Sequence, residues 1–117
     1  MQETPKHMCI QIHTKLLTFD ALEKIKAALY AMVGSEALEV EIELGDDGGP
    51  YMNYLFETNN LIKLWETVRR KIFEEKVIGQ SIKDASIVTA EGESGWSDYL
   101  LLHHFDHSQK LDVLRCN

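Results

Sequence analysis

The segment Leu38–Leu44 alternates strictly between apolar and acidic residues, and this pattern constrains the fold more than any other part of the sequence. Successive side chains of a β-strand point to opposite faces of its sheet. The alternation therefore predicts a half-buried strand that has one face on the core and a row of glutamates on the other. The apolar positions are Leu38, Val40, Ile42 and Leu44, and the acidic positions are Glu39, Glu41 and Glu43.

Four further segments complete the expected strands. Met8–His13 alternates in the same way, with Met8, Ile10 and Ile12 on one side. Tyr51–Thr58 reads as the returning strand of a hairpin, because the six residues before it are rich in glycine and aspartate. Asp98–Phe105 also predicts a strand, and Ala85–Ala90 could form a shorter one before it.

Two amphipathic helices are expected, over Phe19–Val33 and Asn60–Ile78. Thr18 or Asp20 can cap the first helix, and Asn59 or Asn60 can cap the second. The two apolar stripes should be buried against the inward side chains of the strands. The stripes contain Leu22, Ile25, Leu29, Leu64, Trp65, Val68 and Ile72, and the strand positions are Ile10, Ile12, Val40 and Ile42.

The element order predicts an α+β fold of the ferredoxin-like, split βαβ type, with an extra short strand or hairpin before the last strand. Both helices would cover one face of an antiparallel sheet and leave the other face open. In this arrangement the first strand is central and the last strand lies beside it. No family motif accompanies the pattern, and this kind of fold supports many unrelated activities.

A chain of 117 residues fits a single domain, with a flexible N-terminus over residues 1–6 and a tail over residues 108–117 that could be a short helix or an edge strand. No apolar run approaches the roughly 18 residues that span a membrane. The first residues do not resemble a secretory signal. Two cysteines, Cys9 and Cys116, do not make a disulfide framework. We therefore expect a cytoplasmic protein that does not associate with membranes.

The histidines and cysteines gather near the two ends of the chain, and none lies between Thr14 and Leu102. If the first and last strands are neighbours, these side chains could form a zinc or other transition-metal site. The candidate ligands are His13, His103, His104, Cys9 and Asp106. Their spacing matches no zinc signature. Cys9 is also a candidate nucleophile beside His13 or His104.

The register of the last strand decides which histidines share a face, and the sequence leaves two possibilities open. If Leu100 and Leu102 face the core, His103 joins His13 on the open face. If Leu101 and Phe105 face the core instead, His104 and Asp106 join His13.

The net charge of −7 weighs against nucleic acid as a partner, because such binding requires neutralised phosphates. Tyr51 lies on the third strand, where sheet-based RNA-binding proteins carry stacking aromatics, but the glutamate row would repel phosphate. The same row could protect a sheet edge from unwanted pairing or present an acidic surface to a basic protein.

Two functions follow from these patterns. The first is a non-enzymatic binding or regulatory module, for example an inhibitor of a basic partner, that uses its open sheet face or acidic edge. Its binding residues would be Glu39, Glu41, Glu43 and Tyr51. A homodimer or a protein partner is also expected because Tyr51, Trp96, Ile62 and Phe73 leave apolar surface beyond one helical layer. The alternative is a small metal-binding protein or metal-dependent enzyme that uses the terminal histidines; whether the chain is an enzyme is left open.

Overall fold

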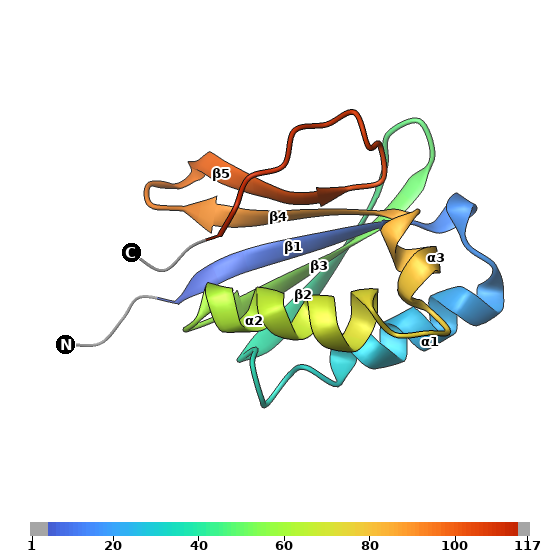
Figure 1. Ribbon diagram of the computed structural model, residues 1–117, viewed down its shortest axis with the longest axis horizontal. Coiled ribbons are helices and arrows are strands. Elements are labelled where there is room, and N and C mark those ends of the chain that lie inside the picture. The colour runs from blue at the N-terminus through green and yellow to red at the C-terminus, as the bar shows by residue number, and fades with distance from the viewer. Residues whose placement is uncertain (1–4, 115–117) are drawn as a thin grey trace.

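A computed structural model describes residues 5–114, in which helices cover one face of a five-stranded antiparallel sheet in an α+β arrangement (Figure 1). The strands follow the spatial order β2-β3-β1-β4-β5. Their bounds are β1 Lys6–His13, β2 Glu39–Asp46, β3 Pro50–Thr58, β4 Ser86–Gly92 and β5 Gly95–His104. The helices are α1 Phe19–Tyr30, α2 Leu61–Val68 and α3 Gly79–Lys83, with a 3-10 turn at Thr14–Leu16 and a π-helical turn at Arg69–Phe73.

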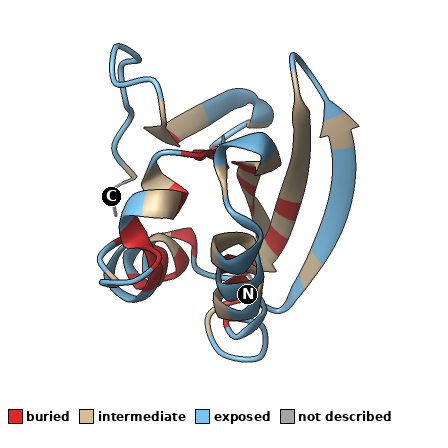
Figure 2. Ribbon diagram, turned by 90° about the vertical axis from the view of Figure 1, so that its right-hand side faces the viewer, coloured by how far each residue is buried: buried red, intermediate tan, exposed pale blue. Residues whose placement is uncertain are grey.

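The core lies between the helices and one face of the sheet, and Figure 2 shows the buried positions gathered there. Leu29 of α1 and Val68 of α2 are both 0% exposed, as predicted, but Ile42, which was expected to be buried against the helices, is 37% exposed. Leu29 and Val68 pack with the inward side chains of the central strands. These inward side chains are Met8, Ile10 and Ile12 of β1, Tyr54 and Phe56 of β3, and Val88 and Ala90 of β4.

Two side-chain caps start the helices where the sequence predicts them. The hydroxyl oxygen of Thr18 accepts a hydrogen bond from the backbone N–H of Ala21, and the side-chain oxygen of Asn60 accepts one from Lys63 N–H, both at 3.1 Å. These bonds satisfy N–H groups that have no partner within the helix.

The single helix predicted over residues 60–78 is wrong after Phe73, where the helical conformation ends. The chain leaves α2 through the π-helical turn, and the Glu75 carboxylate then accepts hydrogen bonds from Val77 N–H and Ile78 N–H at 2.8 and 2.7 Å. These contacts redirect the chain into α3. Gly79 makes this possible, because a Cβ at that position would lie only 2.4 Å from the carbonyl oxygen of Phe73.

The last strand does not lie beside the first, contrary to the sequence-based expectation. Instead β4 pairs with β1, with Ile10 opposite Val88, and β5 pairs with β4 at the edge of the sheet. The turn from Gly92 to Gly95, with φ of +85° at Gly95, folds β5 directly back onto β4. The fifth strand and third helix also differ from a ferredoxin-like arrangement, which is not confirmed.

The side chains that were expected to leave apolar surface uncovered differ in how far they are buried. Phe73 is buried against the edges of the Trp65 and His103 rings, with centroids 5.5 and 4.9 Å away. Ile62 and Tyr51 are half-buried, and Trp96 is exposed. Within residues 5–114, no helix has the length and apolar character needed to cross a membrane.

The ends of the chain bear on two expectations. Residues 105–114 contain neither of the two structures expected for the tail, a helix or a strand, and residues 115–117 lie outside the described part. Most of the expected flexible N-terminus, residues 1–4, also lies outside it, whereas Lys6 already belongs to β1.

Candidate functional site

The sheet face that carries no helix, called the open face below, is the candidate site. Strand register assigns its side chains, because residues directly opposite each other in antiparallel strands point to the same face. One row across the sheet runs from Glu41 through Leu55 and Cys9 to Thr89 and Leu101. The neighbouring row contains Glu43, Asn53, Gln11, Ile87 and His104.

The acidic side of the open face is formed by β2. Glu39, Glu41 and Glu43 are exposed and point to this face, as the alternation predicts. Glu39 lies opposite Glu57 in β3, so the row gains a further carboxylate at one end. Within the described residues, β2 has a strand neighbour on only one of its two sides. The glutamates therefore border a free edge of the sheet.

The centre of the open face mixes apolar and polar side chains, because Gln11 donates a hydrogen bond to the side-chain oxygen of Asn53 there at 3.0 Å. Leu55, Ile87 and Leu101 come from three different strands and are each half-buried. Cys9 lies among them, and burial, assisted by the charge of Glu43, raises the pKa of its thiol to about 11. The thiol is therefore protonated near neutral pH. This environment opposes the expected role of Cys9 as a nucleophile, because the thiolate is the reactive form.

Two histidines meet at the end of the open face, where both contact Phe105. The ring centroid of Phe105 lies 5.0 Å from that of His13 and 4.9 Å from that of His104. Tyr51 packs at 6.0 Å on another side of His13. Burial and the nearby charge of His104 lower the pKa of His13, although Asp47 opposes this. His13 Nε2 donates a hydrogen bond to the side-chain oxygen of Gln11 at 2.8 Å.

His103 lies on the other side of the sheet. Its Nε2 donates a hydrogen bond to the carbonyl oxygen of Lys83 at 2.8 Å, and its ring packs on Phe73. Burial lowers the pKa of His103 despite this hydrogen bond to the carbonyl. A β-bulge explains the placement, because Val88 pairs with His103 whereas Thr89 pairs with Leu101. Neither of the two simple registers considered from the sequence is therefore present.

The proposed metal ligands are thus not brought together as a set. His13 and His104 share one end of the open face, while His103 is on the helix side and Cys9 lies two rows from His13. Asp106 is exposed and accepts hydrogen bonds from the N–H and hydroxyl of Ser108. Over residues 5–114, no group of three or more His, Cys, Asp or Glu side chains has an arrangement that could hold a metal ion.

Comparison with protein-family models, with curated proteins and with solved structures gives no significant match. The chemistry of the open face is therefore the basis for a functional proposal.

Sequence reasoning missed two parts of this face. His7 lies between two carboxylates, since its Nδ1 donates a hydrogen bond to Glu91 and its Nε2 is 3.9 Å from Glu57. Phe105, whose ring contacts both His13 and His104, was expected to be an ordinary strand residue. Extending the alternation of Met8–His13 by one residue would place His7 on the same face as His13, but its acidic neighbours come from strands far away in the sequence.

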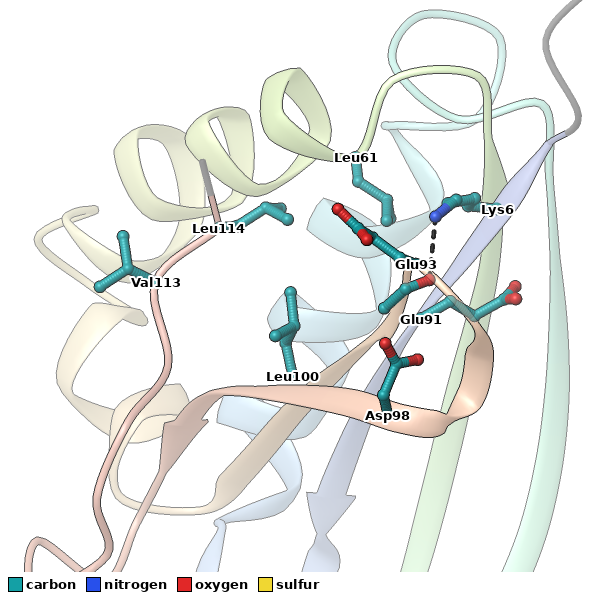
Figure 3. A pocket seen from close by; sticks show the side chains of 9 residues that line it. Lys6, Leu61, Glu91, Glu93, Asp98, Leu100, Val113 and Leu114 are labelled. Atoms are coloured by element: carbon teal, nitrogen blue, oxygen red, sulfur yellow. Dashed lines mark hydrogen bonds between the residues drawn. The ribbon is translucent and has the colours of Figure 1, made fainter. Parts of the chain in front are cut away.

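A cavity of about 420 Å³ lies on the helix side of β5, beside the end of the described chain. Figure 3 shows Leu61, Leu100 and Leu114 pointing toward one another across it. Glu93 and Asp98 stand at its other end, where the Lys6 ammonium donates a hydrogen bond to Gly92 O at 2.9 Å, while the Glu91 carboxylate turns away toward His7. The cavity is separate from the open-face centre, and residues 113–114 form part of its wall.

Proposed function

We propose that this protein is a non-enzymatic binding module that holds a basic protein partner on its open face. One observation carries the proposal: the uncovered side of the sheet combines three half-buried apolar side chains, set among polar ones, with a row of exposed glutamates along β2. Protein interfaces commonly have an apolar centre and a polar rim. Leu55, Ile87 and Leu101 supply the centre, and Glu39, Glu41 and Glu43 supply one side of the rim.

The charge of the chain supports a basic partner. The net charge is −7, and the three glutamates concentrate part of it at one border of the binding surface. Such a surface attracts a basic protein during diffusional encounter and disfavours acidic competitors. It also repels the phosphates of a nucleic acid.

The state of Cys9 favours binding over covalent catalysis on this face. A thiol with a raised pKa acts as a small packed side chain, and Cys9 lies beside the apolar residues that would contact the partner. His13 and His104 would then contribute polar contacts at one end of the interface, with Phe105 between them as an aromatic anchor.

We also infer that the chain follows a split βαβ path as far as β4, with β5 added at the edge. The order β2-β3-β1-β4 and the positions of α1 after β1 and α2 after β3 support this inference. The added strand has a functional consequence, because its residues Leu101 and His104 widen the open face.

Affinity capture from the source cells, followed by reconstitution with the purified partner, tests the proposed function. The test variant replaces Glu39, Glu41 and Glu43 with Gln. We expect affinity to fall about tenfold, since three interactions of about 0.5 kcal/mol each are lost. The control replaces Glu66, Glu74 and Glu93, which are exposed on α2, in the following turn and in the β4–β5 turn, with Gln.

Both variants change the net charge by the same amount, so only the location of the charge differs. The control variant should bind as the wild type does. Equal affinities for the two variants would contradict the proposal, because the open face would then have no special role.

A further inference from the structure

We propose that the free edge of β2 accepts an extended segment of the partner as a sixth strand, in which Lys or Arg alternates with apolar residues. This inference rests on the proposed protein-binding function and adds the way in which the partner is held. Strand addition satisfies the backbone groups of an open edge and lets alternate side chains read the two faces.

The two outer edges of the sheet, at β5 and at β2, differ in their hydrogen bonding. At the β5 edge, the chain itself supplies a partner: Asp112 N–H donates to Leu101 O at 2.7 Å, and the Asp112 carboxylate accepts from Leu101 N–H at 2.8 Å. At the β2 edge, no other strand of residues 5–114 pairs on the side away from β3. An edge strand of eight residues is thus left available for pairing.

The two faces of β2 differ in chemistry. Glu39, Glu41 and Glu43 point to the open face, whereas Val40, Ile42 and Leu44 point to the helix side. On that helix side, Ile42 is 37% exposed and Leu44 is 77% exposed.

α1 contributes one more exposed aromatic side chain on the helix side, Tyr30. Tyr54, which lies opposite Ile42, packs 6.2 Å from the ring of Tyr30, and Tyr30 is half-exposed. The exposed members, Ile42, Leu44 and Tyr30, form an apolar strip beside the edge that carries the glutamates, whereas Tyr54 is fully buried.

Because side chains alternate between the two faces of a strand, the two faces of β2 predict which residues the partner's added strand should carry. Side chains of a strand paired with β2 would alternate between the glutamate row and the apolar strip. Directly opposed side chains lie about 4.5–5.5 Å apart, close enough for ion pairs on one face and apolar contacts on the other. Alternating basic and apolar residues satisfy both faces at once.

A second copy of this chain fits the edge less well. Antiparallel pairing of β2 with another β2 would place glutamates opposite glutamates, and like charges directly opposed across strands are destabilising. A basic segment reverses the sign of that interaction. Charge complementarity therefore selects a different protein as the occupant.

A capped peptide of alternating Lys and Val, long enough to cover β2, provides a direct probe. Its control has the same composition with the lysines grouped at one end. We expect the alternating peptide to bind at least about tenfold more tightly than the grouped one, and to slow hydrogen exchange of β2 backbone amides but not those of β5. Equal binding of the two peptides, or binding without protection in β2, would overturn strand addition.

Two protein variants refine this test. One replaces the β2 glutamates Glu39, Glu41 and Glu43 with Gln, and the other is Leu44→Glu. Each should weaken binding of the alternating peptide. The control variant, with Gln at Glu66, Glu74 and Glu93, should bind the peptide as the wild type does. All of the replaced side chains are exposed, so folding should be preserved. Unchanged binding by both edge variants would also overturn the inference.

The outcome for the natural partner separates the two proposals. If the open-face glutamates are needed for binding but β2 amides stay unprotected in the complex, the partner lies on the face and strand addition is wrong. If the glutamates are not needed at all, the proposed function itself fails.

Discussion

Asp112 closes the outer edge of β5 by making two hydrogen bonds to Leu101, one from its backbone and one to its carboxylate. The two bonds satisfy the outward N–H and C=O groups of Leu101, as a neighbouring strand would do, although residues 105–114 contain no strand. They hold the chain so that Val113 and Leu114 line the cavity on the helix side. The outer edge of β5 is therefore bridged at Leu101, whereas the outer edge of β2 has no strand partner among residues 5–114.

Replacing Asp112 with Ala should remove the side-chain acceptor and leave the backbone bond in place. We expect a loss of about 1 kcal/mol in the free energy of unfolding, together with faster hydrogen exchange at the Leu101 amide. Urea unfolding and amide exchange measure these changes. Asp112→Asn retains an acceptor oxygen and should lose less. An unchanged Leu101 amide in the Ala variant would show that the carboxylate does not hold this edge.

Cys9 should resist alkylation at neutral pH, because its pKa is raised to about 11 and little thiolate is present. The rate constant for iodoacetamide modification, measured in a Cys116→Ser background, should lie far below that of a free cysteine peptide and still increase above pH 9. Modification of the urea-unfolded protein provides the control, since unfolding removes the burial that raises the pKa. A folded-state rate equal to the unfolded rate would contradict this picture.

His103 should make stability depend on pH. Because burial lowers its pKa in the folded protein from 6.5, the unfolded state takes up a proton more readily. The stability contribution is therefore complete above about pH 6.5 and declines as the pH falls from there toward the lowered folded value. Urea unfolding between pH 7.5 and 5.5, compared for the wild type and His103→Gln, should show a smaller pH dependence in the variant. NMR titration of His103 gives a direct check, and a midpoint at or above 6.5 would refute the prediction.

Tyr54 should tolerate the loss of its hydroxyl group. The Tyr54 oxygen is buried without a hydrogen-bond partner among the described residues, and burial raises the pKa of the phenol to about 12. Tyr54→Phe keeps the ring that packs on Tyr30 and removes an unsatisfied polar group. We expect the free energy of unfolding to stay equal or to rise by up to about 1 kcal/mol. Thermal and urea unfolding measure it, and a clear loss of stability would point to a partner for the hydroxyl.

Local patterns in the sequence correctly predicted the parts of the fold that depend on neighbouring residues. The alternation over Leu38–Leu44 placed the glutamates on one face, and Thr18 and Asn60 cap their helices as expected. The apolar stripes placed Leu29 and Val68 in the core. The facing of the glutamates and the burial of Leu29 and Val68 follow from the 2-residue or 3.6-residue period of a single element, and each cap follows from the side chain just before its helix; both are encoded locally.

The tertiary structure decided which strands are neighbours and which histidines meet. Pairing of β4 with β1 depends on contacts between residues far apart in the sequence, and no local pattern distinguishes it from pairing of the last strand with β1. The bulge near Leu102 then turns His103 toward Phe73 and leaves His104 beside Phe105. A shift of one residue exchanges the two faces of a strand, so the side-chain period alone could not assign these histidines.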